Sequence, residues 1–546
     1  MELILCMVPV FYMKLLSDSS GTIILVVHKM LKFVFFLLDW LVTPLILLQT
    51  FRKRKRLPPI RNHLLLLSAT ELAKRIRRKE VSSEEAVKSY IERCQDVNPI
   101  VNAIVETRYD AAVQEARAVD EFLSRCTKTE EELARELPLL GLPITVKESI
   151  AVQGMSHSVG VKKKIVDRAD EDADVVARVR EAGAIVILVS NTPELCLAWE
   201  SNNKVTGSTW NPYDTSKSAG GSSGGEAALL SSAASVVSLS SDIAGSARYP
   251  AMCCGIFGHK PSAHTVCCKG HKPFSSDENW DDYFSIGTMS RYAEDLPLMM
   301  SVISQTDDAR RRFSQETSLK DMKFFYAEEC CGITTSINSD MKAAIHKLRK
   351  YLEATYGAKV QQAKLPDMKY AFDISARSLL NMDVDDVIKE FEGPITSKVF
   401  LELIKYIFCV SRFSFSMVSY AMVKWSYSKF PQRFRHKMDD KAVSLKKQFD
   451  DVLGDNGVLI YPSFISPAHY RYQMYTRTAN YTYMMLYNVL GLPVTQCPIG
   501  FNSKGLPVGV QIVANAGNDH LTIAMAREIE KAFGGWKQPP TTEIPV

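Results

Sequence analysis

The hydrophobic and polar positions along most of the chain follow the periods of helices and buried strands. Apolar residues at helical spacing come after Ser68-Ala-Thr-Glu71 and after Ser82-Ser-Glu-Glu85. Both tetrapeptides are capping-box sequences, so each predicts the start of a helix. A third helix is predicted from Asp110 to Cys126. The segment LPITVKESI (142–150) is apolar and β-branched and follows a glycine, which predicts a strand.

Strands and helices then alternate. Residues 172–182 form an amphipathic helical pattern that ends at Gly183. The run AIVILVS (184–190) is continuously apolar, as is typical of a strand buried on both faces. Further strand and helix patterns of the same style occupy residues 323–329, 340–356, 358–365, 505–513 and 519–535. This alternation predicts one large α/β domain over residues 61–546, with a mixed central sheet covered by helices on both faces.

The first 60 residues have a different pattern. Residues 21–49 are mostly apolar, but two lysines and Asp39 interrupt them. The cleanest stretch, 33–48, is shorter than the roughly 20 apolar residues that cross a bilayer. A buried core helix is one interpretation. We favour a membrane anchor with a basic linker over residues 1–60, because the polar segment 51–63 separates the apolar run from the rest. A transmembrane span, a hairpin and an interfacial helix all stay open.

The charge of the chain is concentrated next to this anchor. The formal net charge is +5 over 546 residues, and the run RKRKR (52–56) carries five positive charges. The remainder is close to neutral, which predicts no nucleic-acid partner. A signal peptide is disfavoured, because positive charge follows the apolar core. Basic residues directly after an anchor favour a cytosolic catalytic body. We therefore expect association with an intracellular membrane of the endoplasmic reticulum or lipid-droplet type.

The cysteines predict reduced thiols. Among twelve cysteines there are three adjacent pairs and no C-x-x-C spacing, a pattern that fits neither a disulfide framework nor a common zinc motif. One cluster keeps a zinc site open as an alternative to buried thiols: Cys253, Cys254, His259, His264, Cys267, Cys268 and His271. We expect neither a metal nor a cofactor.

The segment from Val399 to Trp425 is rich in Phe, Tyr, Met and Val and is dotted with serines and basic residues. Ordinary core helices would explain it. The wall of an apolar channel, or a second membrane-facing patch, would explain it equally well. The sequence leaves these alternatives open.

The stretch GGSSGGEAALLSSAASVVSLSSDIAGSARYP (220–250) holds the candidate nucleophiles. A flexible linker would be rich in Gly and Ser throughout, whereas only the first six residues here are. Residues 220–224 also fit the G-x-S-x-G pattern of a hydrolase nucleophile elbow. An elbow needs a buried strand directly before it, and a polar, turn-rich loop precedes this one. Both interpretations are therefore disfavoured.

A third interpretation uses the whole stretch. The turn DIAGSAR places Ser246 beside the backbone N–H groups of Ile243, Ala244, Gly245 and Ser246 itself, and such a run can form an oxyanion hole. The serine also needs a base, and the nearest histidine, His259, has no clear reason to return to it. A lysine can serve when burial keeps it neutral. Lys147, within the apolar strand pattern, meets that condition.

The pattern GGSSGGE…SDIAGSARYP, with GLPITVKES upstream, resembles the amidase signature family. The likeness covers about residues 67–546, including GAIVILVSNTPEL, GSTWNPYD, GIFGHKPS and NVLGLPVTQCPIGFNSKGLPVGVQIV. It implies the α/β amidase fold and a Ser-Ser-Lys triad: Ser246 as nucleophile, Ser222 as proton bridge and Lys147 as base. It also implies a cis peptide between Gly221 and Ser222.

The resemblance assigns further residues and shows one departure. Ser223, Asp242 and Arg248 match supporting positions around the loops. The family commonly has Gly-Gly before the nucleophile, where this chain has Ala244-Gly245. A methyl group therefore borders the expected site, which puts its geometry or its leaving-group preference in doubt.

The expected activity is amide hydrolysis through an acyl-enzyme. The segment WESNNKVTGSTWNPYD (199–214) resembles the branch of the family that acts on fatty-acid amides. An anchor would bring the site to where apolar substrates partition. A lipophilic amide is therefore the expected substrate and a membrane the expected partner. The alternatives are a small or aromatic amide, an amidotransferase subunit that needs partner chains, and an inactive scaffold. The oligomeric state, a homodimer included, stays open.

Overall fold

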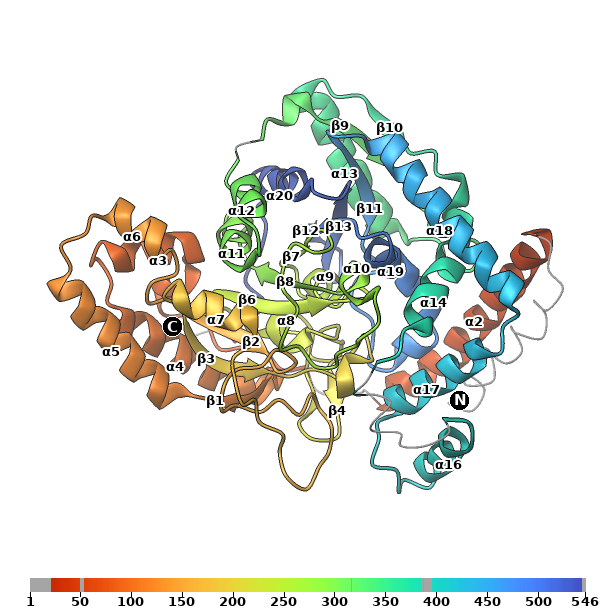
Figure 1. Ribbon diagram of the computed structural model, residues 1–546, viewed down its shortest axis with the longest axis horizontal. Coiled ribbons are helices and arrows are strands. Elements are labelled where there is room, and N and C mark those ends of the chain that lie inside the picture. Colours follow the sequence, from red (N-terminus) through yellow and green to blue (C-terminus); the bar gives the residue numbers. More distant parts are fainter. Residues whose placement is uncertain (1–20, 50–53, 316, 385, 387–394, 543–546) are drawn as a thin grey trace.

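The computed structural model describes residues 21–49, 54–315, 317–384, 386 and 395–542. Within them, one mixed sheet of eleven strands runs through the molecule (Figure 1). In spatial order its strands are β1 (Ile104–Thr107), β3 (Ile185–Ser190), β2 (Pro143–Lys147), β6 (Val237–Asp242), β8 (Ser285–Ser290), β7 (Phe257–Lys260), β12 (Val494–Phe501), β13 (Pro507–Ala514), β11 (Gly457–Pro462), β9 (Lys323–Tyr326) and β10 (Val360–Gln362).

Helices flank this sheet, as the sequence predicts (Figure 1). The α-helices are α2 (Gly21–Gln49), α3 (Ala69–Arg77), α4 (Ser83–Val101), α5 (Tyr109–Arg125), α6 (Glu130–Glu136), α7 (Asp174–Glu181), α8 (Gly224–Ser231), α9 (Arg248–Cys253), α10 (Trp280–Tyr283), α11 (Asp295–Ile303), α12 (Asp307–Phe313), α13 (Ser339–Tyr356), α14 (Ala371–Asn381), α16 (Ile395–Ile407), α17 (Phe415–Ser428), α18 (Gln432–Leu453), α19 (Thr482–Val489) and α20 (Asp519–Phe533). Short 3₁₀ turns are η1 (His63–Leu66), η2 (Glu194–Cys196), η3 (Leu319–Asp321), η4 (Pro366–Tyr370), η5 (Gln473–Tyr475) and η6 (Thr478–Tyr481), and β4 (Asn202–Asn203) pairs with β5 (Gly207–Ser208).

The predicted helix starts are confirmed in their atomic contacts. The Ser68 hydroxyl accepts a hydrogen bond from the Glu71 N–H at 3.0 Å, and the Ser82 hydroxyl accepts one from the Glu85 N–H at 3.0 Å. These side chains satisfy donors that the first turn of a helix leaves without partners. At the other end, Gly357 closes α13 in the left-handed conformation that favours glycine.

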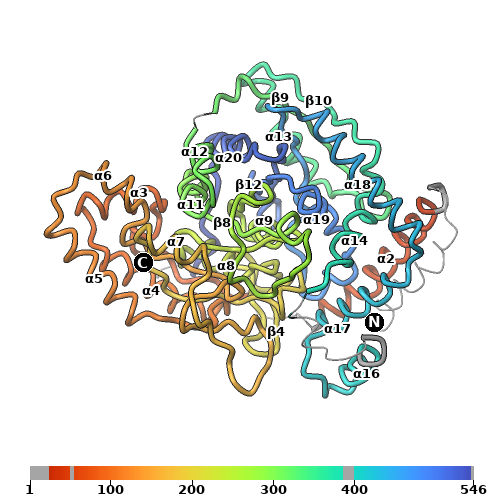
Figure 2. Tube along the Cα trace, in the orientation of Figure 1, coloured from red at the N-terminus to blue at the C-terminus, as the bar shows by residue number. Residues whose placement is uncertain are grey.

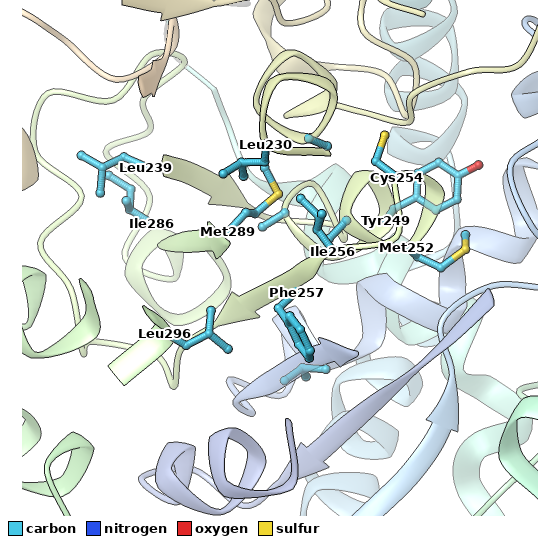
Figure 3. Close-up of a cluster of buried hydrophobic side chains, with 14 of the residues drawn as sticks. Leu230, Leu239, Tyr249, Met252, Cys254, Ile256, Phe257, Ile286, Met289 and Leu296 are labelled. Carbon is cyan, nitrogen blue, oxygen red and sulfur yellow. The ribbon is translucent and has the colours of Figure 1, made fainter. Parts of the chain in front are cut away.

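The core between the sheet and its helices is one continuous cluster of buried apolar side chains. Figure 3 shows one part of it, where side chains of α8, α9 and α11 meet those of β6, β7 and β8. These side chains are buried, and they include Leu230, Leu239, Tyr249, Met252, Cys254, Ile256, Phe257, Ile286, Met289 and Leu296. Burial of this apolar surface fixes α8 against β6 and β8, and α9 against β7. The loops at their N-termini are thereby held in place.

Two strands of the sheet end beside those loops. β2 and β6 are parallel neighbours, with Thr145 opposite Ser238 and Val146 opposite Leu239. Their carboxyl ends therefore meet at one edge of the sheet, which is where open α/β sheets bind ligands. Lys147 is the last residue of β2, and Asp242 is the last residue of β6. Strand pairing thus brings together two positions that lie far apart in the sequence.

The apolar N-terminal run is one long helix, α2, and it packs on the body. Residues 24–48 are long and apolar enough to cross a membrane. Along one side, a stripe of residues at helical spacing is buried: Ile24, Val27, His28, Leu31, Leu38, Val42 and Ile46. Most large apolar residues on its other side are exposed. The helix thus contacts the body. Residues 51–53 of the polar segment that follows it lie outside the described residues.

The segment 399–425 fits two of the three interpretations that the sequence left open. Its second half lies in α17, whose residues Phe415, Tyr420 and Val423 line a cavity. Its first half lies in α16, which exposes Phe400, Leu401, Ile404 and Ile407. Neither half is an ordinary core helix throughout.

Candidate active site

Lys147 stands at the centre of a hydrogen-bond chain at the carboxyl ends of β2 and β6. Its side chain is fully buried. The Lys147 Nζ atom lies 2.7 Å from the Ser222 hydroxyl and 2.9 Å from the Ser241 hydroxyl. Both serines come from the sequence stretch 220–250, one from the loop before α8 and the other from β6.

Burial decides the charge state of this lysine. Removal of the ammonium group from water lowers the pKa of Lys147 below its usual value of 10.5, and the neighbouring Cys196, Asp242 and Glu226 oppose that effect only in part. A lysine with a lowered pKa can be neutral and carry a lone pair. The sequence prediction that apolar surroundings act on Lys147 thus agrees with its burial.

The hydrogen bonds behind Lys147 determine where this lone pair points. His271 Nδ1 lies 2.9 Å from the Pro273 carbonyl, which can only accept, so Nδ1 carries the proton. Burial lowers the pKa of His271 well below its usual range, so Nε2 is unprotonated and accepts a hydrogen bond from the Ser241 hydroxyl at 3.0 Å. The Ser241 oxygen then accepts an N–H from Lys147. A neutral Lys147 keeps its lone pair for the Ser222 hydroxyl.

Ser241 and His271 are functional candidates that the sequence reasoning missed. Ser241 is one of nine serines in its stretch, and nothing in its spacing sets it apart. His271 entered the sequence analysis only through the cysteine and histidine cluster. Its ring reaches the site through a loop between β7 and β8, and no sequence periodicity predicts that return.

The Ser222 loop is shaped by close backbone contacts. The peptide between Gly221 and Ser222 is cis, as the family resemblance implies. A Cβ atom on Gly221 would lie 2.6 Å from the backbone N of Glu200, so only glycine fits there. The Ser223 N–H donates to the Ser246 carbonyl at 3.2 Å, and the Ser223 hydroxyl lies 3.5 Å from the Ser241 carbonyl. Ser223 therefore joins the Ser222 loop to the Ser246 turn.

A buried ion pair holds the Ser246 turn. Asp242 Oδ1 lies 3.0 Å from Arg248 Nη2, and both side chains are fully buried. Burial alone would raise the pKa of Asp242, but the Arg248 guanidinium lowers it to about 2. The carboxylate also accepts the N–H of Gly245 at 2.8 Å and of Ala247 at 3.1 Å. Arg248 in turn donates to Met484, Asn488 and Gln511, which anchors the turn to α19 and β13.

This arrangement reduces the number of N–H groups that are available to the predicted oxyanion hole. Because the Gly245 N–H already donates to Asp242, it is not free to hold an oxyanion in this state of the protein. Ile243, Ala244 and Ser246 keep N–H groups for which the described residues supply no hydrogen-bond acceptor. Three of the four predicted donors thus remain candidates.

The structure also shows how the turn accommodates Ala244, where the family commonly has glycine. Gly245 has a φ of +97°, and a Cβ atom there would lie 2.5 Å from Met484 Cβ, so this position needs glycine. Ala244 is not among the residues with a positive φ, so its methyl group strains no backbone. Its carbonyl accepts the Trp199 indole N–H at 2.8 Å, and the Trp199 ring stacks on Tyr481. The Ala-Gly order therefore fits this turn.

Ser246 and Ser222 open onto one cavity of about 320 Å³, a size that suits small-molecule sites. No hydrogen bond joins the two hydroxyls directly in this structure, and both line the same cavity. The reactive end of the cavity is polar and includes Ser241 and His271. The remaining walls are largely aliphatic and aromatic, and come from α2, α14, α17 and the residues around η2, η5 and η6.

The cysteine and histidine cluster is not a metal site in the part of the chain that the structure describes. Cys253, Cys254 and Cys268 are buried free thiols. His259 hydrogen-bonds to Thr495 and lies 3.3 Å from Asp519. All eleven described cysteines are free thiols; six of them are buried, four are partly buried, and Cys409 is exposed.

Known proteins resemble this chain over most of its length. Residues 85–523 match the family model described as Amidase. The chain is 41% identical to fatty-acid amide hydrolase 2-A of Danio rerio, over 90% of this chain and 93% of that protein. It is 40% identical to fatty-acid amide hydrolase 2 of Homo sapiens, over 88% and 92%. A subunit of the glutamyl-tRNA(Gln) amidotransferase of Fusobacterium nucleatum subsp. nucleatum is 28% identical, over 88% and 99%.

Solved structures agree on the fold. A fatty acid amide hydrolase superposes with a TM-score of 0.69 at 20% identity, covering 88% of this chain and 87% of that one. A peptide amidase from Stenotrophomonas maltophilia gives 0.68 at 21% identity, covering 87% and 99%. The family model, the relatives about 40% identical and the shared fold lead to one conclusion: this chain belongs to the amidase signature family and is an amide-hydrolysing enzyme.

Proposed function

We propose that the protein hydrolyses lipophilic, fatty-acid amides through a Ser-Ser-Lys triad. One observation carries the proposal: the buried Lys147 amine contacts Ser222 at 2.7 Å beside a cavity whose far walls are apolar. Ser246 faces the same cavity and is the proposed nucleophile. Ser223, Asp242 and Arg248 support the two loops without taking part in the chemistry.

The acylation step runs as a proton relay. Neutral Lys147 accepts the Ser222 hydroxyl proton, and Ser222 accepts the Ser246 proton while the Ser246 oxygen bonds to the amide carbon. The N–H groups of Ile243, Ala244 and Ser246 stabilise the resulting oxyanion. When the tetrahedral intermediate collapses, the C–N bond breaks and the proton returns through Ser222 to the leaving nitrogen.

Deacylation repeats the relay with water. A water molecule takes the place of the departed amine and loses its proton through Ser222 to Lys147 as it attacks the ester carbon. Collapse then releases the carboxylic acid, and the same path returns a proton to Ser246. The enzyme ends the cycle in its starting state, and water is the co-reactant consumed.

The apolar cavity favours a lipophilic acyl chain over a small amide. Its walls can remove a long hydrocarbon chain from water, which contributes roughly 0.8 kcal/mol for each CH₂ buried. The relatives about 40% identical are fatty-acid amide hydrolases, and they support the same substrate class. A small amide would leave most of these walls without a contact.

The proposed membrane contact rests on α2 and α16. Both expose apolar side chains, such as Phe36 and Trp40 on α2 and Phe408 just after α16. We propose that these faces contact an intracellular membrane, with the catalytic body in the cytosol. The second candidate function is that of a soluble amidotransferase subunit, which the 28% identity to the Fusobacterium protein favours. A long helix with an exposed apolar face argues against it.

The substrate class is tested with purified protein and a series of straight-chain primary amides from two to eighteen carbons. We expect kcat/KM to rise by at least about 100-fold between the shortest and the long-chain members, because each added CH₂ gains burial. A flat profile, or a preference for the shortest amides, would contradict the fatty-amide proposal. Glutamine hydrolysis that needs a partner chain would support the amidotransferase instead.

The nucleophile is tested by covalent labelling with a fluorophosphonate serine-hydrolase probe. We expect Ser246→Ala to abolish labelling, and peptide mass spectrometry of the wild type to place the adduct on Ser246. Ser301→Ala, a change in a half-buried serine on α11 away from the cavity, is the matched control and should label normally. An adduct on Ser222 would show that the relay order is wrong.

The base is tested by the pH dependence of hydrolysis. Burial lowers the pKa of Lys147, and the neutral amine is the active form. The wild-type rate should therefore rise with pH and reach its plateau below pH 10.5, the usual pKa of lysine. Lys147→Ala should lose roughly 10²–10⁴-fold and lack this plateau, its residual rate still rising at high pH as hydroxide takes over the base's role. Lys164→Ala, at an exposed lysine, is the control. Wild-type rates in Lys147→Ala would rule out the relay.

A further inference from the structure

The buried stripe of α2 reaches into the cavity that holds Ser222 and Ser246. Leu31 and Phe35, one helical turn apart, belong to the lining of that cavity. Leu31 is 4% exposed, whereas the neighbouring Phe33 and Phe36 are 61% and 62% exposed. Neighbouring positions on the same helix therefore face either the cavity or the surroundings of the protein.

Polar contacts fix this side of α2 against the body. His28 Nε2 lies 3.1 Å from Asp373 Oδ2 on α14, and both side chains are buried. Asp373 itself belongs to the cavity lining. Figures 1 and 2 show α2 running beside α14 at the edge of the molecule. The histidine therefore ties α2 to a second wall of the same cavity.

A second set of contacts lies about three to four turns further along the helix. Asp39 Oδ2 lies 3.1 Å from Arg477 Nη2, and Asp39 Oδ1 accepts the Thr476 hydroxyl at 2.6 Å. Gln473 donates to the Thr43 hydroxyl at 3.0 Å. A carboxylate in an apolar helix is costly in hydrocarbon unless it is paired. Asp39, which interrupts the apolar run in the sequence, is paired with the body that the helix covers.

These contacts lock α2 in one rotation about its axis. Rotation by half a turn would break the His28 and Asp39 pairs and would move Leu31 and Phe35 out of the cavity. A helix that served only to attach the protein to a bilayer would need neither a fixed rotation nor buried ionisable partners. The same contacts hold two apolar side chains of the helix at a fixed place in the substrate cavity.

We propose that α2 is a wall of the acyl-binding cavity and that Leu31 and Phe35 select the acyl chain. The inference rests on the proposed function and deepens it, because it assigns chain selection to the segment that the sequence predicts to be an anchor. Phe35 contacts the distal part of the chain, and Leu31 closes the wall beside α14. Short amides that occupy only the serine end of the cavity do not reach either residue.

The test compares full-length variants in detergent micelles, so that membrane attachment does not affect the result. Phe35→Ala removes a ring from the cavity, and Phe36→Ala removes the same ring from the outer face of the same helix. For Phe35→Ala we expect kcat/KM to fall roughly tenfold for a sixteen-carbon primary amide and to stay within about twofold for a four-carbon amide. For Phe36→Ala we expect both values to stay within about twofold. Leu31→Trp, which fills the cavity, should move the preferred chain to a shorter length.

A second arm measures binding without catalysis. The protein used here carries Ser246→Ala, and the ligand is a fluorescent long-chain fatty acid. Adding Phe35→Ala should weaken its affinity about tenfold, whereas adding Phe36→Ala should leave its affinity unchanged. If Phe35→Ala and Phe36→Ala give the same chain-length profile and the same fatty-acid affinity, α2 is not a wall and the inference is overturned. If no amide is hydrolysed but fatty-acid affinity still depends on Phe35, the proposed function is wrong, while the inference that α2 forms a wall of the cavity is supported. Phe35→Leu is a milder change that controls for misfolding of Phe35→Ala, and we expect it to show a smaller effect in the same direction.

Discussion

The site depends on the burial of one lysine. Lys147 stands at the carboxyl end of β2 without contact to water, and its amine touches Ser222 and Ser241. In water this amine would be protonated and would have no lone pair to offer. The sheet favours the neutral amine, because strand pairing on both sides of β2 excludes solvent, and the resulting burial lowers the pKa of Lys147. In the proposed relay, the serine loops and the histidine behind Ser241 act through that neutral amine.

The rest of the structure keeps the serines at this amine. The Asp242–Arg248 pair is fully buried, and its hydrogen bonds reach the Ser246 turn, α19 and β13. Loss of one partner of such a pair leaves a buried charge alone, which destabilises a protein strongly. The pair therefore fixes the turn, and in the proposed mechanism it takes no part in the chemistry. On the far side of the cavity, the charges of α2 act in the same way on the wall that faces the substrate.

The sequence predicts the part of this site that lies in continuous motifs. The strand at 142–150, the capped helices and the loops at 220–225 and 242–248 follow from local patterns. In the structure Ser222 and Ser246 line one cavity, and Lys147 contacts Ser222 from behind its wall. Contacts between segments that are distant in the sequence could not be predicted from local patterns. Nothing local shows that Gly245 donates to Asp242, that His271 returns to Ser241, or that Phe35 faces a cavity lined by residues more than 300 positions later. The position of α2 depends on side-chain pairs such as Asp39 with Arg477, which no periodicity reveals.

The central claim is that Lys147 is neutral when the enzyme works. It is measured directly by NMR on protein labelled with ¹³C at the lysine Cε, with the Lys147 signal assigned from its absence in Lys147→Met. We predict that this signal titrates below the usual lysine pKa of 10.5, and that its midpoint coincides with the rising limb of the hydrolysis rate. A Lys147 signal that stays that of an ammonium group throughout the pH range of activity would contradict the account.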